Sequence, residues 1–165
     1  MAIRTIREMG DSVLGKKCKE VKEMNYRTQL LIADMLETMY DAGGVGLAAP
    51  QVGILKQITV IDIGEEVPVI LVNPKIVEND GEQSGYEGCL SLPGKLGIVT
   101  RPDYVKVEAL NEHMEPITVE GEGLMARALC HEIDHLHGAT FVGLVEGELV
   151  DADELQDIED EGDEE

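Results

Sequence analysis

Apolar residues recur at intervals of three and four over residues 28–40, which predicts an amphipathic helix near the N-terminus. A second helical stretch covers residues 124–137 and stops at Gly138. The other apolar runs are short, rich in Val and Ile, and bounded by Gly, Pro or Asn. They predict strands at 57–63, 67–72, 74–78, 98–100, 104–110, 116–119 and 140–145. The pattern indicates an α+β fold in which short, mostly antiparallel strands pack around a central second helix.

The remaining segments lack a clear period. Residues 1–24 predict an irregular arm on the surface, residues 81–85 a turn or surface loop, and residues 111–114 a hairpin loop. No repeat or linker is visible, so we expect one catalytic domain over residues 1–150. Residues 151–165 then form an acidic tail, of which roughly the last seven residues are expected to be disordered.

The composition of the 165 residues fits a single domain with a real core. Aromatic residues make up 3%, so the core must be aliphatic and rich in Met. No run approaches the roughly 18 apolar residues of a membrane helix, and the N-terminus lacks the apolar segment of a secretory signal. The three cysteines argue against a disulfide framework. We therefore expect a cytoplasmic protein without a membrane partner.

The net charge of −21 is unevenly distributed. Twelve of the 34 acidic residues lie in residues 146–165, which contain no Lys or Arg. Nucleic-acid affinity rests largely on cationic contacts. The charge therefore argues against direct, sequence-specific nucleic-acid binding.

The helical stretch contains an H-E-x-x-H pattern at residues 131–135. Positions four apart share one face of a helix, so His131 and His135 can reach a single ion. Glu132 lies about a quarter turn away, where a carboxylate can take a proton from a water on that ion. On its own the short pattern fits a metal site and a partly solvated helix face about equally well.

A catalytic tetrahedral site takes three protein ligands, so one more is needed. Cys130 is next to His131 in the sequence, so on a helix its side chain points about 100° away from the ligand face. We therefore expect Cys130 in the core. Cys89 lies in an extended stretch before Pro93, and its thiolate suits a soft or borderline divalent ion. Taken alone, a buried structural cysteine is the simpler interpretation of Cys89.

A run of small residues at 43–53 cannot form an ordinary helix or strand, and a plain loop is one interpretation of it. Gln51 is the one polar side chain in this run. Its amide is therefore a candidate for binding a polarised carbonyl.

Three segments, GVGLAAPQ (44–51), EGCLS (87–91) and HEIDH (131–135), occur in this order. Together they resemble the signature motifs of the bacterial peptide deformylases, each without a gap. The resemblance covers nearly all of the chain up to about Val145. It implies hydrolysis of the N-formyl group of N-formylmethionyl nascent peptides, with release of formate.

The resemblance also implies roles for individual residues. Cys89, His131 and His135 would bind one ion, with Fe²⁺ as the native metal and Zn²⁺, Ni²⁺ or Co²⁺ able to replace it. Glu132 would act as general base and acid, while Gln51 and the backbone N–H of Leu90 stabilise the oxyanion. Substrate would contact Val45 and Gly46 and a methionine pocket with walls from Tyr86, Leu124, Arg127 and Ala128. Arg127 suits the rim of such a pocket, through its aliphatic stem.

Further expectations concern the residues around the proposed ligands and the partners of the protein. We expect Asp134 to face solvent, and Glu87 and Arg101 to pair, either bracing the EGCLS segment or as a surface pair. Some members of the family contact the ribosome through a basic C-terminal helix. Here the tail is acidic, so any transient ribosome contact would need another route.

Two other functions use the same residues. A metallopeptidase would need a third ligand after the motif, for which Glu146 or Glu148 could serve. A binding module with a closed structural zinc would need a fourth ligand and would leave Glu132 unexplained. Replacing Glu132 with Ala separates an enzyme from a binding module.

Overall fold

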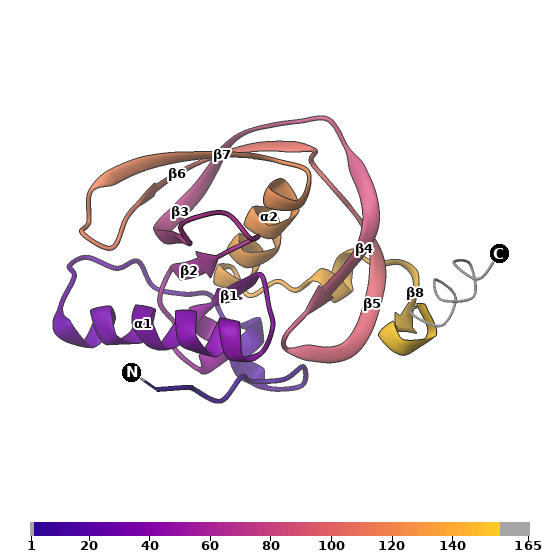
Figure 1. The fold of residues 1–165 in the computed structure, drawn as a ribbon, viewed down its shortest axis with the longest axis horizontal. Helices are drawn as coiled ribbons and strands as arrows, with labels where there is room; N and C mark the ends of the chain where they lie inside the picture. The colour runs from indigo at the N-terminus through magenta and orange to yellow at the C-terminus, as the bar shows by residue number, and fades with distance from the viewer. Residues whose placement is uncertain (1, 156–165) are drawn as a thin grey trace.

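The structure, a computed structural model, describes residues 2–155, in which two antiparallel sheets lie against two helices (Figure 1). The helical elements in chain order are η1 (Ser12–Gly15), α1 (Tyr26–Asp41), η2 (Ala49–Val52), α2 (Leu124–Leu136) and η3 (Phe141–Leu144). The strands are β1 (Gly46–Ala48), β2 (Ile58–Ile61), β3 (Val69–Asp80), β4 (Gln83–Cys89), β5 (Leu92–Arg101), β6 (Tyr104–Leu110), β7 (Pro116–Glu122) and β8 (Glu146–Asp151).

The larger sheet has five strands in the order β1-β2-β3-β6-β7, and the smaller has three in the order β4-β5-β8. Every pairing of named strands is antiparallel. In Figure 1 the β4–β5 hairpin and β8 lie on the right of α2, and α1 lies below the larger sheet. The predicted α+β class with antiparallel strands is confirmed.

Each helix covers part of an aliphatic core. Asn25 caps α1, because its side chain accepts a hydrogen bond from the backbone N–H of Thr28 at 2.9 Å. Met35 and Met39 of α1 are fully buried against β1 and β2. Helix α2 is buried on nearly all sides, as expected of a helix held between other elements. Its buried residues, among them Leu129, pack with β3, β6 and β7.

The strand predictions were wrong in several boundaries. The predicted strands 67–72 and 74–78 are replaced by one strand, β3, which begins at Val69 and whose pairing with β6 is irregular between Val72 and Lys75. Asn73 adopts φ 52° at this irregularity, which a sequence pattern of alternation does not reveal. The predicted loop 81–85 is shorter, since β4 already begins at Gln83. The short strand 98–100 is the end of the longer β5.

The segment after α2 also differs from the prediction. Residues 140–145 contain the 3-10 helix η3 instead of a strand, and the strand that returns to the sheet is β8. Strand β8 pairs with β5, with Asp151 opposite Lys95. The expected disorder of the last seven residues lies outside the described residues, and the domain boundary at 150 stays a prediction. Within residues 2–155, no helix has both the length and the apolar character needed to cross a membrane.

The N-terminal arm is irregular, as predicted, apart from η1 and a bridge between Lys19 and Lys56. It is nevertheless held by specific contacts. The N–H groups of Arg7 and Met9 donate to backbone oxygens of Gln51 and Ser91 at 2.6 and 2.8 Å. The arm thus touches two of the three motif segments directly.

Candidate active site

The end of β4 meets one face of α2 at a cluster of three potential metal ligands. One ligand atom each from Cys89, His131 and His135 lies within 4.8 Å of the others. It is the one such cluster found among residues 2–155. The helix contributes both imidazoles because residues 131 and 135 are one turn apart. The structure therefore brings together the two histidines of the H-E-x-x-H pattern and the cysteine that the family resemblance implied as third ligand.

The ring nitrogens of both histidines are arranged for an ion. Nδ1 of His131 lies 2.8 Å from Oε2 of Glu87, which fixes that nitrogen as the N–H donor and leaves Nε2 as a ligand. Nε2 of His135 lies 3.4 Å from Sγ of Cys89. Burial lowers the pKa of His135 to about 3, so its ring is neutral, as a metal ligand requires. One thiolate and two imidazoles fit a borderline divalent ion such as Fe²⁺ or Zn²⁺.

Glu87 is the centre of a buried charge network behind the cluster. Its carboxylate accepts hydrogen bonds from Arg101 at 3.0 and 2.7 Å and from Arg127 at 3.0 Å, besides the one from His131. Burial alone would raise the pKa of Glu87, but its bonds to His131 and Arg101 lower it to about 2. The predicted Glu87–Arg101 pair is confirmed, and it lies in the interior.

Asp134 belongs to the same network, so the expectation that it simply faces solvent was wrong. Its Oδ2 accepts a hydrogen bond from Nη1 of Arg101 at 2.7 Å. The carboxylate is partly exposed while the guanidinium is buried. Asp134 therefore binds Arg101, and Arg101 in turn binds the Glu87 carboxylate that orients His131.

Glu132 lies beside the ligands and is 4% exposed. Its Oε1 is 3.6 Å from Nε2 of His131, and among the described residues its Oε2 has no hydrogen-bond partner. Burial raises the pKa of Glu132 to about 7. A Cβ atom on Gly46 would lie 2.9 Å from Cγ of Glu132, so only glycine leaves room for the carboxylate.

Gln51 approaches the cluster from η2 and is fully buried. Its Oε1 accepts a hydrogen bond from the N–H of Ala48 at 2.9 Å, and its Nε2 lies 3.4 Å from Sγ of Cys89. The amide N–H₂ group therefore faces the ligand cluster. Ser91, which the sequence analysis did not single out, accepts a hydrogen bond from the same Nε2. The only signal for Ser91 was its place in the EGCLS segment.

A pocket of about 580 Å³ opens next to the cluster. Gln51 and His135 lie outside its lining. Val45, Tyr86 and Leu124 stand at its edge with 45%, 47% and 54% of their surface exposed. The predicted site residues in its lining are Val45, Gly46, Tyr86, Cys89, Leu90, Leu124, Arg127, Ala128, His131 and Glu132.

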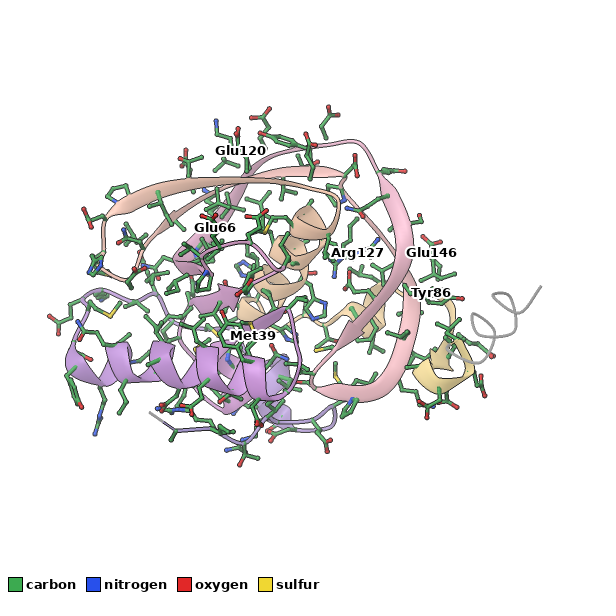
Figure 2. The ribbon with its side chains drawn as sticks, in the orientation of Figure 1. Met39, Glu66, Tyr86, Glu120, Arg127 and Glu146 are labelled. Atoms are coloured by element: carbon green, nitrogen blue, oxygen red, sulfur yellow. The ribbon has the colours of Figure 1, made fainter. Side chains whose placement is uncertain are left out.

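Arg127 contributes to the wall of this pocket in a particular way. Figure 2 shows Arg127 between α2 and the β4–β5 hairpin. Its Nη1 donates to Oε1 of Glu87 and to the backbone oxygen of Val99, at 3.0 and 3.1 Å. The guanidinium charge is thus matched in the interior, and Arg127 adds no free charge to the pocket.

Comparisons with known proteins point to the same family that the three motif segments resemble. The family model described as polypeptide deformylase matches residues 3–148. The peptide deformylase of Lachnoclostridium phytofermentans is 60% identical over 163 residues, 98% of this chain and 100% of that protein. The peptide deformylase of Agathobacter rectalis is 61% identical over 151 residues, 92% of this chain and 95% of that protein.

Solved structures give the same result. The crystal structure of a peptide deformylase from Legionella pneumophila has a TM-score of 0.85 and 45% identity, covering 87% of this chain and 86% of that one. A peptide deformylase from Synechococcus elongatus, in complex with actinonin, has a TM-score of 0.83 and 43% identity, covering 86% of this chain and 78% of that one. The matched family region includes all three motif segments and the whole ligand cluster.

Proposed function

This chain belongs to the peptide deformylase family, hydrolases that remove the formyl group from nascent peptides, and from that premise we propose how its own residues perform the reaction. The observation that carries the proposal is the grouping of Cys89, His131 and His135 next to Glu132 on one pocket. Its substrates would be peptides with an N-terminal formylmethionine, and its products formate and a free N-terminal methionine.

Cys89, His131 and His135 would hold one divalent ion, with Fe²⁺ as the native metal and Zn²⁺, Ni²⁺ or Co²⁺ able to replace it. A bound ion of this kind lowers the pKa of a water and polarises a carbonyl oxygen. The Glu87 carboxylate would keep His131 in the tautomer that binds. Helix α2 would be the central element of this catalytic domain, because it carries both imidazoles and Glu132.

Glu132 would move the protons of the reaction. Its burial and raised pKa suit a group that must both accept and return a proton near neutral pH. It would take the proton of the attacking water and pass it to the departing amine. Gln51 and the backbone N–H of Leu90 would donate hydrogen bonds to the formyl oxygen as negative charge develops there.

The remaining lining residues would bind the peptide. Val45 and Gly46 would lie along its backbone, and Tyr86, Leu124, Arg127 and Ala128 would enclose the methionine side chain. The pairing of Arg127 with Glu87 is compatible with an apolar side chain, since it leaves no unmatched charge in this wall. A transient ribosome contact would use a surface other than the acidic residues 146–155.

The alternative functions have less support. A metallopeptidase would need Glu146 or Glu148 as third ligand, and neither belongs to the ligand cluster found in residues 2–155. Glu146 pairs with β5, and its Oε1 accepts a hydrogen bond from Thr100 at 2.6 Å, while Glu148 is exposed. A closed structural zinc would need a fourth ligand, and the cluster found in residues 2–155 has three. The binding module also leaves the buried carboxylate at position 132 unexplained.

The test is formate release from a formyl-Met peptide by anaerobically prepared, iron-loaded protein, measured beside Glu132→Ala and an exposed control, Glu148→Ala. We expect turnover by the wild type and the control, and its loss in Glu132→Ala with the metal content unchanged. A folded, metal-loaded wild type without formate release would overturn the proposed function. Equal turnover by Glu132→Ala would overturn the role of the carboxylate.

A further inference from the structure

Ser91 is a buried polar residue beneath the pocket that the proposed reaction has not yet used. It is fully buried, and it is not part of the pocket lining. Its Oγ accepts a hydrogen bond from Nε2 of Gln51 at 3.0 Å. Its backbone N–H points at Sγ of Cys89, 3.4 Å away. Ser91 is therefore bonded both to a proposed metal ligand and to the proposed oxyanion donor.

The orientation of the Gln51 amide follows from its partners. The backbone N–H of Ala48 can only donate, so the atom 2.9 Å from it must be the amide oxygen. The N–H₂ group then has two hydrogens to place. One is taken by Oγ of Ser91, and the other is left for the side of Cys89, where Nε2 lies 3.4 Å from Sγ. Ser91 thereby decides where the second hydrogen points.

The N-terminal arm reinforces this arrangement from behind. The N–H of Arg7 donates to the backbone oxygen of Gln51 at 2.6 Å, and the N–H of Met9 donates to that of Ser91 at 2.8 Å. Two residues of the N-terminal arm thus hold the backbones of both partners. The separation of Gln51 and Ser91 is fixed from the backbone as well as through their side chains.

We propose that Ser91 is a positioning residue for deformylation, which aims one N–H of Gln51 at the formyl oxygen by accepting the other. The inference rests on the proposed function. A donor fixed in advance stabilises charge in the transition state without reorganising, so its loss should lower kcat and leave KM nearly unchanged.

The first test compares Ser91→Ala with a matched control, Thr28→Ala. Thr28 also has a buried hydroxyl that accepts one hydrogen bond, from Lys56, but it does not line the pocket next to the ligand cluster. We expect Ser91→Ala to lower kcat by about 10- to 100-fold, the range typical of residues that orient a catalytic group. KM should stay within about 2-fold, since ground-state binding does not use this hydrogen bond. Thr28→Ala should keep the kcat of the wild type. An unchanged kcat in Ser91→Ala would overturn the proposal while leaving the deformylase activity of the wild type intact.

A double variant separates positioning from a general structural role. If Ser91 acts through Gln51, then Ser91→Ala should cost less than about 2-fold in kcat once Gln51→Ala is present. Equal fold losses in both backgrounds would show that Ser91 acts independently of Gln51, and would overturn the proposal.

A measurement on the unmodified protein covers the case in which Ser91→Ala does not fold. In the zinc-loaded wild type, the two side-chain amide protons of Gln51 can be followed by NMR. The proton bonded to Ser91 should exchange with solvent markedly more slowly than the one on the side of Cys89. Equal and fast exchange of both protons would contradict a fixed amide.

Discussion

Nδ1 of His131 and Oε2 of Glu87 lie 2.8 Å apart, and both side chains are buried. The Glu87 carboxylate, which is not itself a proposed ligand, thus determines which ring nitrogen of His131 is free to bind a metal. The same carboxylate pairs with Arg101 and Arg127. The relationship links the stability of the interior to the binding of the metal.

Glu87→Gln should weaken metal binding and stability together. The neutral amide keeps the shape of the side chain but leaves buried arginines less compensated, at a cost of about 3 kcal/mol in the free energy of unfolding. Loss of the partner of His131 should lower zinc affinity by about 10- to 100-fold. Competition with a chelator measures the affinity, and Glu78→Gln, on the exposed end of β3, serves as control. Wild-type affinity in Glu87→Gln would show that the carboxylate does not orient His131.

Gly46→Ala should impair turnover, because the new methyl group would lie 2.9 Å from Cγ of Glu132 and displace its carboxylate. A shift of about 1 Å in a catalytic group can cost about 100-fold in rate. Overpacking should also lower stability by about 1–3 kcal/mol. Gly143→Ala is the matched control, since a Cβ there meets nothing within 4 Å. The interpretation fails if both alanine variants turn over at the rate of the wild type.

Zinc should stabilise the protein through Cys89 and not through Cys130. Ligand present at 100 times its Kd raises the free energy of unfolding by about 2.7 kcal/mol. Burial raises the pKa of the Cys130 thiol to about 11, and its side chain packs in the core cluster around α2. Thermal melts of the metal-free protein with and without zinc should show the shift in wild type and Cys130→Ala, and not in Cys89→Ala. A full zinc shift in Cys89→Ala would remove the thiolate from the ligand set.

The anchor of the N-terminal arm should give a pH-dependent contribution to stability. Burial alone would raise the pKa of Asp34, but hydrogen bonds from the N–H of Ala2 and from Arg4 outweigh it and hold that pKa below its usual 3.8. Between these two values the unfolded chain binds more protons, so stability rises with pH there. The contribution is fully present above about pH 4 and is lost as the pH falls through the folded-state value.

Asp34→Asn removes this contribution. Denaturant titrations should show the variant less stable than the wild type at pH 7, with the difference shrinking as the pH is lowered below about 4. Glu78→Gln, which removes a carboxylate on an exposed strand, should show no such trend. A difference that stays constant over the whole range would mean that Asp34 does not act through its charge.

The sequence determined the features that depend on neighbours along the chain. A period of three to four residues located α1 to within two residues, because one face of that helix is buried in the core. Gly138 indicated the end of α2 to within two residues. The spacing of His131 and His135 set them one turn apart on one face of α2. Cys89 was identified through the EGCLS segment and its resemblance to a family, since spacing alone could not join residues 42 positions apart.

Contacts between residues far apart in the chain depend on the folded arrangement of the strands and helices. Asp134 was expected to face solvent, yet β5 carries Arg101 to it across 33 positions in the chain. Ser91 carried no signal of its own, and its contact with Gln51 spans 40 positions. Such contacts depend on the register of β4 against β5 and on the path of the N-terminal arm. Strand register and backbone hydrogen bonds are fixed by the packing of the whole core, and so they leave no periodic trace in the local sequence.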